Sequence, residues 1–151
     1  MNWKYNGNEI TDVSQLPSNT HGFVYKITHI PSGKAYIGKK VLQFHRKVKL
    51  TKKDLLIYEG QPGRKPKYKL KIKESDWKTY YGSNKTLTEL INNEPVENFK
   101  RTILKLATTK KLLTYYETQH QFVNQVLERP DEFFNDNILG KFFKKDFESQ
   151  D

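Results

Sequence analysis

Two tyrosine hydroxyls are the first groups in this sequence whose spacing suggests chemistry. Tyr25 lies in the run Gly22-Phe-Val-Tyr-Lys-Ile-Thr28, and Tyr36 lies in the run Lys34-Ala-Tyr-Ile-Gly38. The turn signal Pro31-Ser-Gly33 separates the two runs. Because both runs are rich in β-branched and aromatic residues, we expect them to form a β-hairpin.

The length of the hairpin loop decides whether the two hydroxyls can act together. A loop of four residues pairs Ile27 with Tyr36 and sets Gly38 opposite Tyr25, so that both hydroxyls point to one face. A loop of three residues pairs Thr28 with Tyr36 and turns Tyr25 to the opposite face. In the first register, Gly38 has no side chain and leaves a place where a phosphate can approach.

The charge of the chain points to a polyanionic partner. Lys and Arg number 27 against 17 Asp and Glu, which gives a formal net charge of +10. A positive field of this size attracts nucleic acid, although general solubility is the alternative interpretation. We expect no membrane partner, because no stretch approaches 18 apolar residues.

The absence of cysteine narrows the possible chemistry further. A chain with no Cys excludes disulfides, zinc-thiolate sites and cysteine nucleophiles. The N-terminal residues MNWKYNGNEI lack a charged segment followed by an apolar run, so we expect no secretory signal and a cytoplasmic location.

The elements that must position the two tyrosines follow from hydrophobic periodicity and turn signals. The mixed apolar and basic run 41–50 predicts a helix that carries His45 and Arg46. A capping box of Thr86 and Glu89 predicts the start of a second helix. The strand-like run 98–106 predicts a third strand beside the hairpin, and the apolar spacing over 110–127 predicts the longest helix.

These elements predict one α/β (α+β) domain with a small, three-stranded, mainly antiparallel sheet flanked by helices. Glu117 lies on the longest predicted helix, beside its buried stripe. We expect a single domain over 1–151, composed of a polar N-terminal arm (1–21), a catalytic module (22–140) that holds a basic insertion (51–73) with a possible strand at 68–72, and a charged tail (141–151).

At this point the sequence resembles the GIY-YIG nucleases, whose name records two short motifs on adjacent strands. The second motif is complete as Tyr36-Ile-Gly38, whereas the first reads Phe23-Val-Tyr25 and keeps only its tyrosine. The resemblance implies a catalytic arginine on the helix after the second motif, and Arg46 follows Tyr36 by ten residues. The stretch 74–83 also looks like small GIY-YIG proteins of tailed bacteriophages, in which case the host cytoplasm is the location.

The resemblance further implies a metal-binding glutamate on a later helix and an asparagine near the end of the module. Glu117 in Leu113-Thr-Tyr-Tyr-Glu117 matches the glutamate, and Asn135 or its rival Asn137 matches the asparagine. The implied activity is that of a DNA endonuclease that hydrolyses phosphodiester bonds with one divalent cation held by Glu117. Carboxylate and water ligands suit Mg²⁺ or Mn²⁺.

The implied roles divide between activating water and neutralising charge. Tyr25 is the general base or a water-orienting group, and nearby cations such as Lys34 must lower the pKa of its phenol from about 10. Arg46 contacts the nonbridging phosphate oxygens, Tyr36 orients the water or contacts the phosphate, and His45 is a possible helper. Because the first motif is incomplete, the alternative is a catalytically inactive nucleic-acid-binding module of the same fold.

Basic and aromatic residues outside these motifs predict the DNA contacts. Phosphate tracking is the natural role of a basic loop interleaved with tyrosines, and a solvated loop is the alternative. The candidate DNA-binding residues are Lys39, Lys40, Arg64, Lys67, Lys69, Tyr81, Lys85 and Asn135. Specificity stays open and can come from the insertion, from a homodimer or from an accessory protein.

Overall fold

The computed structural model describes residues 1–148, which form two compact units. The first unit comprises 1–42 together with 76–148, and the second comprises 43–75. The last three residues of the predicted charged tail lie outside the described part of the chain. Within the described residues, no helix has both the length and the apolar character that crossing a membrane requires.

A five-stranded mixed sheet is the centre of the first unit, so the predicted three-stranded sheet is too small. In spatial order its strands are β2 (Asn8–Ile10), β1 (Trp3–Tyr5), β7 (Phe99–Ala107), β3 (Gly22–His29) and β4 (Ala35–Val41). The three strands that the sequence predicts are β3, β4 and β7, and β3 pairs antiparallel with both neighbours. The two additional strands come from the segment that the sequence indicates only as a polar arm.

Burial of Trp3 explains why the N-terminal segment joins the sheet. The Trp3 indole is 1% exposed and its Nε1 donates to the carbonyl of Trp77 at 2.7 Å. The Arg101 guanidinium lies 4.7 Å from the Trp3 ring centroid and donates to the Met1 carbonyl. This hydrogen bond joins β7 to the residue at the start of the chain, just before β1. A guanidinium has five N–H donors, so Arg101 can make this bond and others at the same time.

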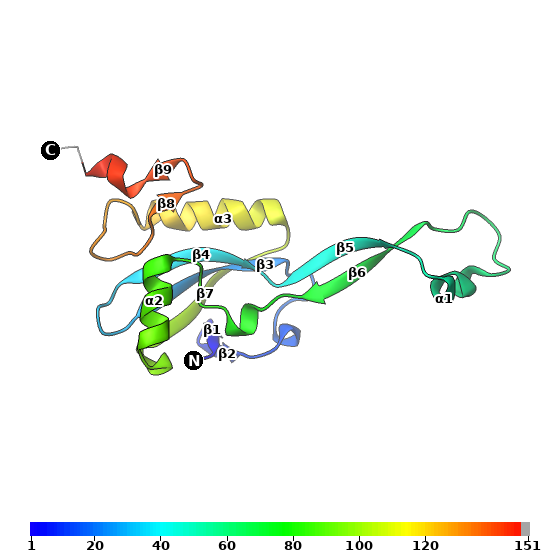
Figure 1. Ribbon diagram of the computed structural model, residues 1–151, viewed down its shortest axis with the longest axis horizontal. Helices are drawn as coiled ribbons and strands as arrows, with labels where there is room; N and C mark the ends of the chain where they lie inside the picture. The colour runs from blue at the N-terminus through cyan, green and yellow to red at the C-terminus, as the bar shows by residue number, and fades with distance from the viewer. Residues whose placement is uncertain (149–151) are drawn as a thin grey trace. The chain divides into compact units, whose positions relative to one another are not determined.

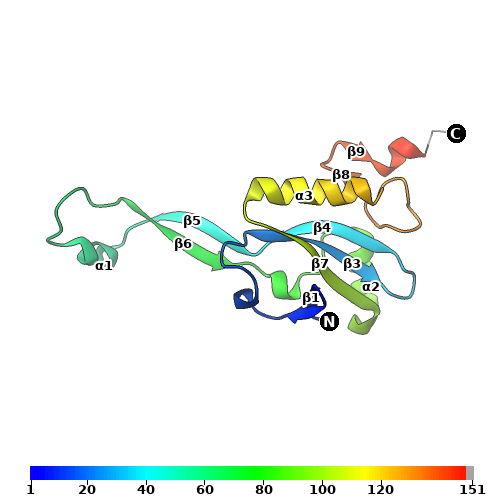
Figure 2. The same ribbon diagram turned by 180° about the vertical axis from the view of Figure 1, so that it is seen from behind.

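Two hydrophobic cores lie on opposite faces of the sheet. Helix α2 (Lys85–Asn93) packs Leu87 against Phe23, Tyr25 and Trp77 in the first core. Helix α3 (Lys110–Val123) packs Leu113 against the second core on the other face. Figures 1 and 2 show the sheet between these two helices in both views.

The predicted helices are present, with different ends. The side chain of Asn84 caps α2 by accepting from the Leu87 amide at 3.0 Å, so the predicted Thr86 capping box is wrong. Helix α3 stops at Val123, short of the predicted 127. Gln125 follows with a positive φ of 53°, which ends the helix before the apolar pattern does.

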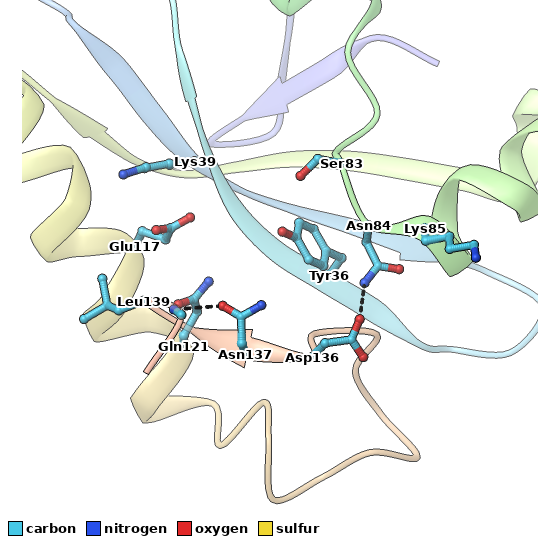
Figure 3. A pocket seen from close by; sticks show the side chains of 11 residues that line it. Tyr36, Lys39, Ser83, Asn84, Lys85, Glu117, Gln121, Asp136, Asn137 and Leu139 are labelled. Atoms are coloured by element: carbon cyan, nitrogen blue, oxygen red, sulfur yellow. Dashed lines mark hydrogen bonds between the residues drawn. The ribbon is translucent and has the colours of Figure 1, made fainter. Parts of the chain in front are cut away.

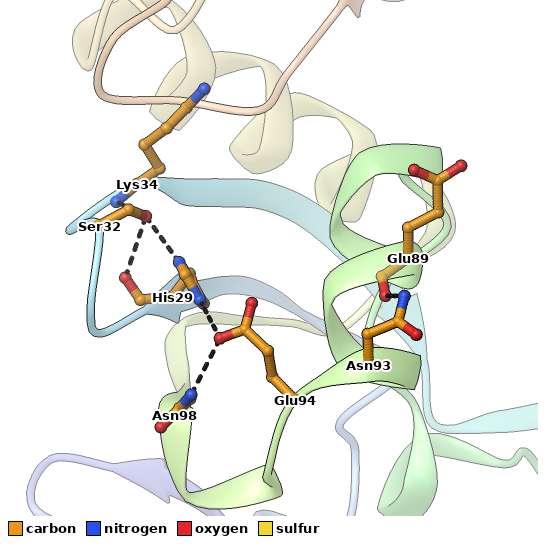
Figure 4. Close-up of polar contacts among 7 residues, drawn as sticks. All are labelled: His29, Ser32, Lys34, Glu89, Asn93, Glu94 and Asn98. Atoms are coloured by element: carbon orange, nitrogen blue, oxygen red, sulfur yellow. Dashed lines mark hydrogen bonds and ion pairs between the residues drawn. The ribbon is translucent and has the colours of Figure 1, made fainter.

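The turn between β3 and β4 has the four-residue register. Tyr25 pairs with Gly38 and Ile27 pairs with Tyr36, as that register requires. His29 secures the turn: its Nδ1 is 2.7 Å from Ser32 Oγ and its Nε2 is 2.8 Å from Glu94 Oε1 (Figure 4). His29 therefore ties the hairpin turn to the end of α2.

The outer edge of β4 is covered by side chains and by the C-terminal segment. The Asn135 amide pairs with the Ile37 backbone, with its Oδ1 accepting at 3.1 Å and its Nδ2 donating at 2.9 Å. Gln121 Nε2 also donates to the Ile37 carbonyl, at 3.0 Å. Beside them, Ala35 exchanges backbone hydrogen bonds with the carbonyl of Glu132 and the amide of Phe134. An edge that is covered in this way cannot pair with another chain.

The second unit is a two-stranded antiparallel ribbon, so the predicted helix over 41–50 is wrong. Strand β5 (Gln43–Lys49) pairs along its full length with β6 (Tyr68–Glu74). The ends of the ribbon are joined by a loop that contains the short helix α1 (Lys52–Leu55). The predicted strand at 68–72 is confirmed, and its partner is the segment that was expected to be helical. Regular alternation of apolar and basic residues in β6 was the signal that a partner strand must exist.

The remaining elements are short. They comprise the two-residue strands β8 (Asn137–Ile138) and β9 (Phe142–Phe143), which pair with each other, and single 3₁₀ turns at Val13–Gln15, Leu56–Tyr58, Trp77–Thr79, Val96–Asn98 and Lys144–Phe147.

Candidate active site

A polar pocket of about 410 Å³ lies at the outer side of β4. Figure 3 shows its two walls: Glu117 on α3 lies on one side of Tyr36, and Asn84 and Lys85 at the start of α2 lie on the other. Its lining residues are Tyr36, Lys39, Ser83, Asn84, Lys85, Glu117, Gln121, Asp136, Asn137, Leu139 and Gly140. Most of these side chains are polar or charged, which suits a hydrophilic ligand.

The close approach of two tyrosines explains the glycine of the second motif. Tyr25 and Tyr36 share a face of the hairpin, with ring centroids 6.2 Å apart. A Cβ at Gly38 would lie 2.6 Å from the Tyr25 hydroxyl oxygen and 2.8 Å from Cε1 of Tyr36. Only glycine leaves room for both rings, so the space that was expected to admit a phosphate is filled by the Tyr25 hydroxyl.

The two phenols differ in access to the pocket. Tyr36 lines the pocket, whereas Tyr25 is 1% exposed and packs its ring edge to face against Tyr80, with centroids 5.9 Å apart. Burial is the main cause that raises the pKa of Tyr25 well above 10, with Tyr80 and Tyr36 as further causes. The expectation that nearby cations lower this pKa is therefore wrong.

The pKa of Tyr36 is also raised, again mainly by burial. A hydrogen bond with the Ser83 side chain acts in the opposite direction, and the negative charges of Glu117 and Asp136 add to the increase. Both phenols are protonated at neutral pH and can donate hydrogen bonds.

Glu117 is a half-buried carboxylate at the wall of the pocket. Its burial raises its pKa, while the charge of Lys39 and a hydrogen bond from the Lys39 backbone amide lower it. The same amide belongs to the outer edge of β4, two residues beyond Ile37, so Glu117 continues the covering of that edge. This bond fixes the carboxylate beside the pocket.

Two lysines supply positive charge in the pocket. Lys39 on β4 extends to α3, where its Nζ donates to Thr114 Oγ1 at 2.9 Å. Lys85 is the first residue of α2, at the helix end where unpaired backbone N–H groups and the helix dipole favour anions. The pocket therefore joins two carboxylates, those of Glu117 and Asp136, to two ammonium groups and the positive end of a helix.

Several predicted site residues lie elsewhere. His45 and Arg46 are exposed neighbours on β5, not residues of a helix that follows the second motif. Lys34 lies at the hairpin turn with its Nζ 4.9 Å from the Phe134 ring centroid, and it does not line the pocket. The structure thus brings together Tyr25, Tyr36 and Glu117 within the first unit.

The predicted DNA contacts also separate into groups. Lys39 and Lys85 line the pocket, while Arg64, Lys67 and Lys69 belong to the second unit. Lys40 pairs with Asp76, and the Tyr81 hydroxyl bonds the N-terminal amine of Met1 at 3.2 Å. Asn135 is 1% exposed and holds the edge of β4, so a contact with DNA in this conformation is excluded.

Sequence reasoning missed Ser83, Asn84, Gln121 and Asp136 as pocket residues. Asn84 is 8% exposed, and its Nδ2 donates to the Phe134 carbonyl at 3.0 Å and to Asp136 Oδ2 at 3.4 Å. It therefore connects the start of α2 to the segment around Asn135. The signal that was available is the Gly82-Ser83-Asn84 turn before a helix, which is a typical place for an N-cap and an anion.

A comparison of the chain with family profiles matches residues 3–138 to the SegE GIY-YIG family, described as "Putative endonuclease segE, GIY-YIG domain". No curated protein and no solved structure matches the chain. The matched segment covers nearly all of the described residues and includes both tyrosine motifs, Glu117 and every lining residue of the pocket except Leu139 and Gly140. The chain belongs to the SegE GIY-YIG family, an endonuclease domain family.

Proposed function

We propose that this protein is a metal-dependent DNA endonuclease that hydrolyses phosphodiester bonds in the pocket over β4. The observation that carries the proposal is the arrangement around Tyr36, where Glu117 stands on one side and Lys85 stands on the other. A phosphodiester needs positive charge on its nonbridging oxygens and a stabilised departing oxygen. The pocket offers groups for both within one polar cavity.

A divalent cation fits the donor set of the pocket. Glu117 is the one catalytic-site carboxylate that the family resemblance assigns to a metal, and a single carboxylate is a normal anchor for Mg²⁺ or Mn²⁺ when substrate phosphate completes the shell. Among the described residues, no group of three His, Cys, Asp or Glu could hold an ion by itself. When bound, the cation would stabilise the departing oxygen as a Lewis acid.

The side chains of the pocket then have separate roles. The Tyr36 hydroxyl is protonated at neutral pH because its pKa is raised, so it can donate a hydrogen bond to a nonbridging oxygen or orient the attacking water. Lys39 and Lys85 neutralise the phosphate, which is the role that the sequence suggested for Arg46. Tyr25 is a positioning residue, because its buried ring supports Tyr36 and the path of β4 at Gly38.

An incubation of purified protein with supercoiled plasmid tests the proposal. With Mg²⁺ or Mn²⁺ the wild-type chain should nick or linearise the plasmid, and Glu117→Ala should not. Lys100→Gln, which changes an exposed residue of β7 outside the pocket, is the control and should cut as the wild type does. An inactive wild type that still binds DNA would favour the nucleic-acid-binding module, and equal activity of Glu117→Ala would remove the metal assignment.

A further inference from the structure

The second unit carries almost all of the net charge of the protein. Residues 43–75 hold eleven Lys and Arg against three Asp and Glu, a charge of +8, while the whole chain has +10. The rest of the chain is therefore close to neutral. The basic side chains of residues 43–75 repel one another, and a bound polyanion would offset this repulsion. The second unit is therefore the part of the chain where we expect nucleic acid to bind.

The β5–β6 ribbon has two distinct faces, and both meet solvent. Every residue of β6 is exposed, including Leu70 at 63% and Ile72 at 58%, and residues 44–47 of β5 are exposed too. Because paired residues share a face, the register places one set of side chains together, which we call the arginine face: Phe44, Arg46, Val48, Lys69, Lys71 and Lys73.

Like charges oppose each other at the centre of the arginine face. Arg46 is paired directly with Lys71, and like charges in such a cross-strand pair are destabilising. Lys69, by contrast, is held by Asp54, whose carboxylate lies 2.8 Å from the Lys69 Nζ. An anion placed over Arg46 and Lys71 would relieve their repulsion.

A two-stranded antiparallel ribbon is an element that a groove of DNA can receive. The major groove of B-form DNA is about 12 Å wide and admits a two-stranded β-ribbon, where Arg and Lys can bond O6 and N7 of guanine. We propose that the β5–β6 ribbon enters the major groove of duplex DNA with its arginine face toward the bases. Arg46 is the reader of base edges, and the surrounding lysines contact bases or phosphates.

This inference rests on the proposed function only in taking duplex DNA as the substrate. It assigns affinity and sequence preference to the second unit and leaves hydrolysis to the pocket. A second copy of the chain is unsuited to bind the ribbon through its own ribbon, because two ribbon units that each carry a charge of +8 would repel each other.

The test is a binding measurement with the full chain, a fluorescein-labelled duplex and EDTA, so that cleavage plays no part. Arg46→Gln/Lys71→Gln removes two charges from the arginine face. Lys4→Gln/Lys100→Gln removes two charges from the sheet of the first unit and is the matched control. We expect at least a tenfold loss of affinity for the ribbon variant and less than a twofold loss for the control.

A second readout locates the groove. Dimethyl sulfate methylates guanine N7 in the major groove, and the wild-type chain should protect some of these atoms, whereas Arg46→Gln/Lys71→Gln should not. A-form duplex RNA has a deep, narrow major groove that side chains cannot read, so it should compete poorly. Circular dichroism of both variants should match the wild type.

Three results would overturn the inference: equal loss of affinity in the two charge-matched variants, binding without any N7 protection, or a ribbon variant that changes oligomeric state but not DNA affinity. Whether the wild-type chain cuts DNA in a cleavage assay tests the proposed function and not the binding role of the ribbon. A chain that binds through the ribbon but cuts no DNA would contradict the proposed function alone. A chain that cuts without any dependence on Arg46 and Lys71 would contradict the ribbon alone.

Discussion

At the scale of residues, the two tyrosines of the hairpin have different positions and so different expected roles. Tyr36 reaches the pocket and Tyr25 supports it from the core. We predict that Tyr36→Phe lowers the cleavage rate about 100-fold, because loss of a single hydrogen-bond donor to the charge that develops in a transition state costs about this much. The loss should appear in single-turnover rates with DNA affinity unchanged.

A matched variant in the same ring cluster separates catalysis from packing. Tyr80→Phe removes a hydroxyl that bonds Tyr25, outside the pocket lining. It should lower the free energy of unfolding by about 1 kcal/mol and leave more than a third of the activity. Equal rate losses in Tyr36→Phe and Tyr80→Phe would show that the Tyr36 hydroxyl has no special role.

Gly38 gives a second prediction at this scale. Gly38→Ala places a Cβ against both tyrosine rings, and we expect the cleavage rate to fall more than tenfold and unfolding to become easier by about 1–3 kcal/mol. Gly22→Ala is the control, because its Cβ would meet the Lys40 carbonyl at 2.5 Å and Leu113 instead. Denaturation and cleavage assays should show destabilisation in both variants, and a loss of rate per folded molecule only in Gly38→Ala.

We predict that the Glu117 carboxylate, which the proposed activity needs, makes the folded protein less stable. Its folded pKa is raised by burial, so the charged form costs stability as pH rises from the unfolded pKa through the folded one. Glu117→Gln keeps a hydrogen-bond acceptor for the Lys39 amide and removes this cost.

The variant should therefore unfold at a higher temperature than the wild type at pH 8. The difference should disappear at pH values below the unfolded pKa of about 4.3. Thermal melts across this range measure it. A melting temperature of Glu117→Gln at pH 8 that is below that of the wild type would contradict the burial of a charged carboxylate.

At the scale of elements, the hydrogen bonds at the edge of β4 predict that replacing Asn135 destabilises the protein more than replacing Asn137. Asn135→Ala leaves the Ile37 amide and carbonyl with fewer buried partners, and we expect a loss of about 2 kcal/mol in the free energy of unfolding. Asn137→Ala, in an exposed residue of the pocket, should lose less than 0.5 kcal/mol. Urea denaturation of the two variants distinguishes the roles, and equal losses would contradict the assignment.

The elements that the sequence predicts well are those whose partners lie nearby in the chain. The β3–β4 register follows from loop length and the alternation of Tyr25, Ile27 and Tyr36, all within one hairpin. Helix α3 follows from its periodicity. The elements that were missed depend on distant partners: β1 joins β7 through burial of Trp3 and contacts of Arg101, which no local pattern contains.

The false helix over 41–50 has the same cause. Its mixed apolar and basic residues fit a helix or a strand equally, and the choice depends on β6, which begins only at Tyr68. This error also moved Arg46 to the wrong element. The cations that line the pocket, Lys39 and Lys85, come from a strand edge and a helix start that only the folded chain brings together.

At the scale of the whole molecule, the two units differ in how strongly they are held. The first unit contains both hydrophobic cores, whereas the ribbon exposes its faces. Leaving the C-terminal tail aside, the first trypsin cuts should therefore fall within residues 43–75. Bound duplex DNA should slow the cuts within 43–75. Mass spectrometry of early fragments measures the order, and first cuts within the sheet would contradict it.

The central claim is that the pocket over β4, and not the basic ribbon, carries out hydrolysis. Its most direct test is the single-turnover cleavage of an end-labelled duplex with Mg²⁺ by the wild type and Glu117→Gln, with DNA affinity measured in parallel. We predict that both proteins bind equally and that only the wild type cuts. Cleavage by Glu117→Gln at the wild-type rate would contradict the claim.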